Sequence, residues 1–205
     1  MAVQYFDSAE LIDEYLKRYQ EDNGLTDGEM EERRRLGGIE GILPGFLLND
    51  RSLYNRYVNF AVGMIRRVIS DGVVLKKMRQ VARHDADRLV YQEMRGAHRV
   101  FSGISGDEGG LLRIAGRFSG KELTALDARA YDAVCEFVNT INGAFASDLS
   151  GEDVFLEVIP PVSRPDGTTL STNCNLYGLP AVVDGYDIEL FFAFDCDIGI
   201  ADMNT

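Results

Sequence analysis

The stretch that decides the fold is residues 126–149, which read LDARAYDAVCEFVNTINGAFASDL. In an α-helix successive side chains are rotated by about 100°, so residues three and four places apart share a face. One side of this stretch is apolar and carries Val134, Phe137, Val138, Ile141 and Phe145. The other side lies within about 60° of Glu136 and carries Asp132, Glu136, Asn139 and Gly143. The stretch therefore predicts a long amphipathic helix with one buried and one exposed face.

The same pattern occurs earlier in the chain, in residues 52–69, where Asn59 and Gly63 stand 80 positions before Asn139 and Gly143. One face of this earlier stretch carries Ser52, Arg56, Asn59 and Gly63. The other face carries Tyr54, Tyr57, Val58, Ala61 and Ile65. A repeat of this kind predicts a pseudo-symmetric pair of long helices packed on one sheet.

β-branched and aromatic runs between and after these helices predict strands. The expected strands are residues 73–80, 94–104, 109–116, 154–162, 168–176 and 188–195. The glycine-rich segment 103–110 lacks the spacing of a nucleotide-binding loop, and its residues 105–108 predict the turn of a hairpin. The order of helix, strands, helix, strands predicts an α+β fold with a largely antiparallel sheet.

Residues 1–50 form a separate unit in this interpretation, a helical N-terminal extension before a domain of residues 51–205. Asp7 with Glu10, and Thr26 with Glu29, have the spacing of a capping box, in which two side chains satisfy the free N–H groups of a helix start. The glycines and the proline of residues 36–50 are typical of a connector.

Composition excludes several classes of partner. The 205 residues include 33 acidic and 21 basic side chains, for a net charge of −12, which disfavours binding to nucleic acid or to anionic membranes. We expect no membrane span and no export signal, because no run of about 18 apolar residues occurs and the first residues are neither basic nor apolar. Three cysteines without a CxxC pair are too few for a disulfide framework, so we expect a reducing, cytoplasmic location. No metal-ligand spacing is present around the two histidines.

The exposed face of the second helix carries the candidate chemistry. It reads Asp132-x3-Glu136-x2-Asn139, with Gly143 one turn beyond and a Pro-Pro pair, Pro160 and Pro161, after the next strand. A glutamate and an asparagine on a wet face are also compatible with simple solvation. However, asparagine and glycine both weaken a helix interior, and two such choices along one stripe indicate that something approaches closely there.

This pattern resembles the signature of the CheC, CheX and FliY phosphatases of bacterial chemotaxis. The resemblance covers roughly residues 50–195. A single intact motif is similar to CheX, because CheC carries two, and Arg56 stands where the repeat copy would need an acid. The spacing leaves open whether Pro160 or Pro161 corresponds to the proline of the family.

The resemblance implies hydrolysis of the aspartyl phosphate of a CheY-like response regulator. Asn139 would orient the attacking water, and Glu136 would bind a basic side chain of the regulator. Asp132 and Gly143 would contact the partner, and Ser52, Arg56 and Asn59 would form a degenerate second site. The protein would need no cofactor of its own, because the phosphorylated receiver brings Mg²⁺ and its own lysine. The resemblance also suggests a homodimer.

Two other interpretations stay open at this point. A module of the same fold could bind a receiver or a flagellar-switch protein without hydrolysing anything. Alternatively, the motif could be accidental in an unrelated α+β domain, which a fully buried Asn139 would indicate.

Overall fold

The computed structural model describes residues 20, 26–29, 51–70, 72–76 and 78–203 of the chain. Its main helices are α4 (Arg51–Met64), which continues into a π-helical turn, η1 (Ile65–Ile69), then α5 (Glu108–Ser119) and α6 (Ala128–Ser150). Its strands are β1 (Val74–Leu75), β2 (Arg79–Ala86), β3 (Leu89–Gly96), β4 (Arg99–Gly106), β5 (Leu156–Val158), β6 (Val162–Arg164), β7 (Thr168–Val183), β8 (Tyr186–Phe194) and β9 (Gly199–Asp202).

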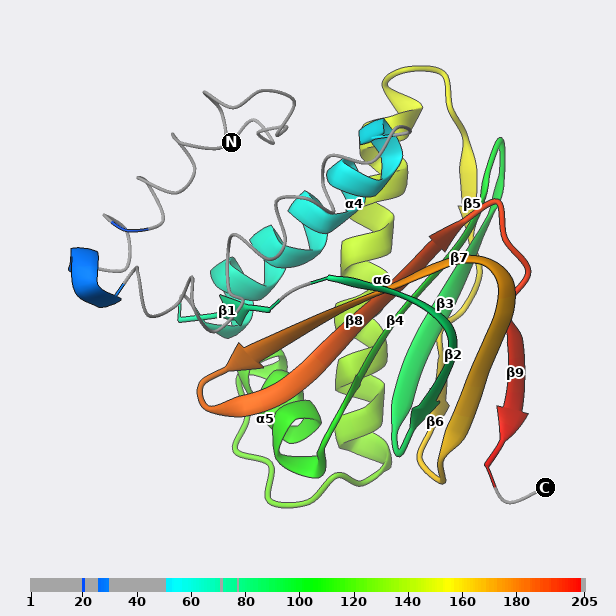
Figure 1. Ribbon diagram of the computed structural model, residues 1–205. Coiled ribbons are helices and arrows are strands. Elements are labelled where there is room, and N and C mark those ends of the chain that lie inside the picture. Colours follow the sequence, from blue (N-terminus) through cyan, green and yellow to red (C-terminus); the bar gives the residue numbers. More distant parts are fainter. Residues whose placement is uncertain (1–19, 21–25, 30–50, 71, 77, 204–205) are drawn as a thin grey trace.

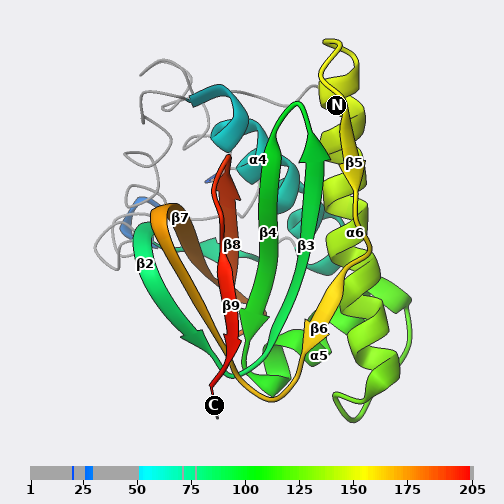
Figure 2. The same cartoon turned by 90° about the vertical axis from the view of Figure 1, so that its right-hand side faces the viewer.

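The strands form one curled antiparallel sheet with α4 and α6 on the same face (Figures 1 and 2). The strand order is β1-β7-β8-β4-β3-β5, with β2 and β9 paired to β7 and with β6 paired to β3. The main core fills the space between the helices and the sheet. A smaller core lies on the other face and consists of Ala86, Leu89, Phe101, Leu170, Leu176, Phe191, Ala193 and Cys196. The predicted α+β class, with two long helices on an antiparallel sheet, is confirmed.

Helix α6 forms where its periodicity predicts it. Asp127 caps its start, because the Asp127 carboxylate accepts hydrogen bonds from the backbone N–H groups of Arg129 and Ala130, both at 3.0 Å. The five apolar residues of the predicted inner face are all at most 2% exposed. This burial fixes the rotation of α6 about its axis and so determines which side chains face outward.

The predicted hairpin with its turn at residues 105–108 is wrong. The hairpin joins β3 to β4, and residues 109–116 belong to α5. Asp107 starts this helix by accepting a hydrogen bond from the N–H of Gly110 at 2.6 Å. Leu111 and Ile114 then place a helical stripe in the core. Gly110 serves packing, because a Cβ there would lie 2.8 Å from the Asp187 carbonyl oxygen.

The other predicted strands exist with different bounds. Residues 73–80 contain β1 and only the start of β2, whose charged remainder shows no apolar alternation. Residues 94–104 span the end of β3 and most of β4, and residues 154–162 contain β5 and the first residue of β6. Residues 168–176 and 188–195 correspond to β7 and β8.

Most of the proposed N-terminal extension lies outside the described residues. One part that can be checked is the capping box at Thr26. Its hydroxyl oxygen accepts from the Glu29 N–H at 3.3 Å, and the Glu29 carboxylate accepts from the Thr26 N–H at 2.8 Å, so this capping box is confirmed. The pair Asp7 and Glu10 lies outside the described residues, and the boundary near residue 50 stays a prediction. No helix among the described residues is long and apolar enough to span a membrane.

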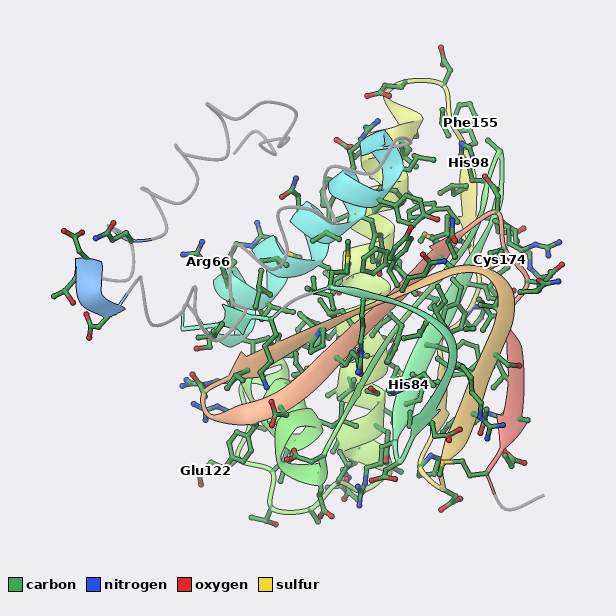
Figure 3. All side chains as sticks on the ribbon, in the orientation of Figure 1. Arg66, His84, His98, Glu122, Phe155 and Cys174 are labelled. Atoms are coloured by element: carbon green, nitrogen blue, oxygen red, sulfur yellow. A yellow bond between two sulfur atoms is a disulfide. The ribbon has the colours of Figure 1, made fainter. Side chains whose placement is uncertain are left out.

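Two of the three cysteines are paired, although their number alone predicted no disulfide framework. Cys174 and Cys196 form a disulfide, with their Cα atoms 6.1 Å apart. The pairing of β7 with β9 explains this bond, because it sets Ser171 opposite Gly199, and the same register continued brings Cys174 opposite Cys196. Figure 3 shows Cys174 at the curled part of the sheet, away from the helices. The inference of a reducing compartment from the cysteine count therefore loses its basis.

Candidate functional site

The outer face of α6 carries the predicted site residues. Asp132, Glu136 and Gly143 are exposed, and Asn139 is half-buried. Residues at i and i+3 of a helix lie about 5 to 6 Å apart at their Cβ atoms, so Glu136 and Asn139 are neighbours on a rigid element. Asn139 is not sealed inside the molecule, which removes the observation that would have favoured an accidental motif.

Asn139 is held from below by the sheet. The Nε2 group of Gln92, on β3, donates to Asn139 Oδ1 at 2.8 Å and to the carbonyl oxygen of Ile159 at 2.7 Å. Gln92 itself is 1% exposed. The asparagine side chain therefore has one edge anchored on a buried amide and the rest of its surface open toward solvent.

A break in the edge of the sheet makes room for this anchor. β5 and β6 both pair with β3, with Met94 opposite Val158 and Tyr91 opposite Val162. Between these pairs, two residues of β3 face three residues, 159–161, of the other chain segment, which is a β-bulge. Pro160 and Pro161 occupy the bulge, where their missing N–H groups cost no ladder bond. The proline pair and Asn139 thus meet at Gln92.

Glu136 is available for a partner. Within the part of the chain that the structure describes, no hydrogen bond or ion pair engages its carboxylate, although its backbone carbonyl accepts from the Thr140 hydroxyl at 2.7 Å. Gly143 is equally open, since a Cβ built there would meet nothing within 4 Å. The glycine is therefore not required by the packing of α6 on its own core.

Cys135 lies next to Glu136 in sequence but has no nucleophilic character. Burial raises the pKa of its thiol to about 11, and the neighbouring carboxylates of Asp132 and Glu136 add to the shift. The thiol stays protonated at neutral pH and packs as a small apolar group.

The predicted second site on α4 is not an exposed copy of the first. Arg56 is only 6% exposed, and its guanidinium binds Asp148 and Glu152 at the far end of α6. The distances are 3.1 Å from Nε to Asp148 Oδ2 and 2.7 Å from Nη1 to Glu152 Oε2. Asn59 is half-buried, and the side chain of Ser52 lies outside the described residues. The prediction that Arg56 faces solvent is wrong, because this position faces the second helix.

Sequence reasoning missed the polar residues beneath α6. Gln92, Ser102 and Asn142 are each at most 1% exposed and are linked to one another by hydrogen bonds. A glutamine and a serine at inward positions of two hydrophobic strands were the available signal. Among the described residues, no three His, Cys, Asp or Glu side chains are grouped so that they could hold a metal ion.

Comparisons with known proteins agree with the fold. Residues 89–183, which run from β3 to the end of β7, match the family described as chemotaxis phosphatase CheX. CheX from Vibrio vulnificus is 20% identical, with a TM-score of 0.59 over 69% of this chain and 98% of that chain. CheX from Desulfovibrio desulfuricans is 15% identical, with a TM-score of 0.58 over 69% of this chain and 98% of that chain.

A third structure is a complex of CheX with CheY, BeF3 and Mg²⁺ from Borrelia burgdorferi. It is 16% identical, with a TM-score of 0.56 over 70% of this chain and 97% of that chain. A search of the curated proteins finds no match. At these identities the solved structures establish a shared fold, and the family match covers the segment that contains both Gln92 and α6. Residues 89–183 thus match the CheX family, and the fold of the described chain is the one that solved CheX and CheC-like proteins share.

Proposed function

We propose that this protein binds a phosphorylated CheY-like receiver domain and accelerates hydrolysis of its aspartyl phosphate. The observation that carries the proposal is the pair on α6: an unengaged carboxylate, Glu136, one helical turn from an anchored amide, Asn139. The Borrelia burgdorferi complex of CheX with CheY supports the choice of partner.

The chemistry suits a neutral amide. Phosphoryl transfer asks for an aligned nucleophile and for stabilisation of charge on the phosphoryl oxygens. The receiver brings Mg²⁺ and a lysine for the charge, so the visiting protein has only to place one water. Asn139 can do this, because its carbonyl oxygen has a second lone pair for a water proton and its NH₂ group donates, with no added negative charge beside the phosphate.

Glu136 fixes the position in which α6 docks on the receiver. Its carboxylate binds a basic side chain of the receiver, and the rigid helix then fixes where Asn139 stands relative to the phosphoryl group. Gly143 and Asp132 extend the same face, and Gly143 lets the partner backbone come close. Two exposed apolar side chains, Phe155 just before β5 and Val162 at the start of β6, offer further docking surface (Figure 3 labels Phe155).

The test is loss of phosphate from a phosphorylated CheY-like receiver, with and without the protein. We expect the wild type to accelerate the loss and Asn139→Ala to reduce that acceleration about 100-fold while still binding the receiver. Glu136→Ala should weaken binding itself. The matched control is Asn59→Ala, which changes the corresponding position of α4 and should keep the wild-type rate.

The competing function is a receiver-binding or flagellar-switch adaptor. It uses the same exposed helix, so it also predicts binding that depends on Glu136. A wild-type protein that binds the receiver but leaves its phosphate lifetime unchanged would establish the adaptor and refute the phosphatase.

Two expectations that come from the family belong to the same proposal. We propose a homodimer, which light scattering of the purified chain would test, and a cytoplasmic location alongside the receiver, which cell fractionation would test. A monomer at micromolar concentration, or protein recovered outside the cytoplasm, would remove the respective expectation without touching the reaction.

A further inference from the structure

A chain of buried hydrogen bonds connects α4 to Asn139. Asn142, on the inner side of α6 and fully buried, accepts from the Tyr57 hydroxyl through Oδ1 at 2.9 Å. Its Nδ2 group donates to Gln92 Oε1 at 2.7 Å and to Ser102 Oγ at 2.8 Å. Gln92 then donates to Asn139. Each polar side-chain atom of Asn142 and Gln92 therefore has a partner.

The Ile159 carbonyl fixes the direction of the amides in this chain. Its oxygen can only accept, so it must face the NH₂ group of Gln92. Gln92 Oε1 then faces Asn142, whose NH₂ group must donate to it. Asn142 Oδ1 is left to accept from the Tyr57 hydroxyl.

We propose that Gln92 is a positioning residue, which holds Asn139 in the one amide orientation that serves the reaction. With Gln92 donating from below, Asn139 Oδ1 is turned toward the sheet edge and keeps one free lone pair, while Nδ2 faces outward. A flip of the Asn139 amide would set two NH₂ groups against each other and is therefore disfavoured. This inference rests on the proposed function of Asn139.

Burial separates this role from partner binding. Gln92 is 1% exposed and Asn142 is fully buried, so neither can contact a receiver docked on α6. A change at Gln92 should alter the rate of the chemical step through Asn139 and leave affinity for the receiver as it is. A residue that only completes the core would instead affect stability, with no change in kcat of the folded protein.

The deciding variant is Gln92→Glu in the full chain. Its ionised carboxylate still accepts from Asn142 but cannot donate to Asn139 or to Ile159. We expect kcat for receiver dephosphorylation to fall about 10- to 100-fold with KM within about twofold of wild type. Because burial favours the neutral acid, whose O–H can donate, the ratio to wild type should recover as the pH is lowered.

The matched control is Gln80→Glu. Gln80, on β2, also donates through Nε2 to an asparagine, Asn175 Oδ1, at 2.6 Å, but it lies on the exposed surface away from α6. This variant should retain the wild-type kcat at every pH. If the buried carboxylate prevents folding, Gln92→Met, similar in length and uncharged, should show the same loss of kcat without recovery at low pH.

Two results would overturn the proposal: an unchanged kcat in folded Gln92→Met, or in folded Gln92→Glu at a pH high enough to ionise its carboxyl, or a rise in KM with kcat retained. Failure of the proposed function is distinguishable, because the wild type would then be inactive and Asn139→Ala would change nothing. In that case the side-chain amide signal of Asn139 in nitrogen-15 NMR spectra tests whether Gln92 positions Asn139. A shift in Gln92→Glu that is absent in Gln80→Glu supports the positioning, and no shift refutes it.

Discussion

Replacing Arg56 by leucine tests how the two long helices are held together. The guanidinium is nearly buried and binds two carboxylates, Asp148 in the last turn of α6 and Glu152 just after it, whose side chains are 32% and 62% exposed. Charged hydrogen bonds contribute about 1.5 to 3 kcal/mol each, but the carboxylates left behind by Arg56→Leu can return to water. We therefore expect the free energy of unfolding to fall by about 2 kcal/mol.

Variants of the two carboxylates should differ in how much they lower the free energy of unfolding. Asp148→Ala leaves the buried guanidinium without its closer partner, which is the costlier kind of break, so we expect a loss of about 3 kcal/mol. Glu152→Ala removes a largely exposed partner and should cost about 0.5 to 1 kcal/mol. Urea titration of the full chain, followed by circular dichroism, measures all three. An Arg56→Leu protein within about 0.5 kcal/mol of wild type, or a Glu152 effect exceeding that of Asp148, would refute the reasoning.

Four further variants or treatments address other parts of the structure. Gly143→Ala should raise the free energy of unfolding by up to about 1 kcal/mol, because open space surrounds its Cβ position; a destabilised variant in urea would show that this glycine serves packing. Reduction of the Cys174–Cys196 bond, which closes a separation of 22 residues, should cost about 3 kcal/mol in the same titration, and equal midpoints with and without reductant would contradict it. Alkylation of Cys135 should be slow at pH 8 and rise about tenfold per pH unit toward its pKa of about 11, as followed by mass spectrometry; fast labelling at pH 7 would argue against the buried thiol. Asp107→Ala should lower the free energy of unfolding by about 1 kcal/mol through loss of the α5 cap, and an unchanged value would mean that the cap contributes nothing.

The long helix of the site was predictable because its signals are local. The apolar stripe and the cap at Asp127 both lie within the segment itself. All five residues predicted for the inner face are buried. Helix α5 carried the same kind of signal, with Leu111, Ile114 and Phe118 at helical spacing, but the glycines around it are equally typical of a turn. For residues 109–116 the strand period was chosen over the helical period, and the sequence analysis therefore predicted a strand where a helix forms.

The partners of individual side chains were not predictable, because they depend on distant segments. Whether Arg56 faces water or α6 depends on how two helices 80 residues apart cross on the sheet, and the helical pattern alone treats the position as polar and exposed. Cys174 and Cys196 meet because the register of β7 with β9 places them opposite each other. Strand β2 went largely unnoticed, since a half-exposed strand at a curled edge has no apolar alternation to reveal it.

In the candidate site, too, the sequence predicts which side chains are present but not how they are oriented. The identity of Glu136 and Asn139, and the face that they share, follow from the spacing of three residues in a helix. What those side chains present to a partner does not, because the atom that Asn139 turns outward depends on Gln92 of β3, and the orientation of Gln92 depends on Asn142 and on the Ile159 carbonyl in the broken edge strand. A motif in one helix therefore specifies the functional groups, whereas their orientation is a property of the packed sheet beneath them. It follows that two chains with the same three-residue spacing can differ in rate through a buried residue that no motif contains.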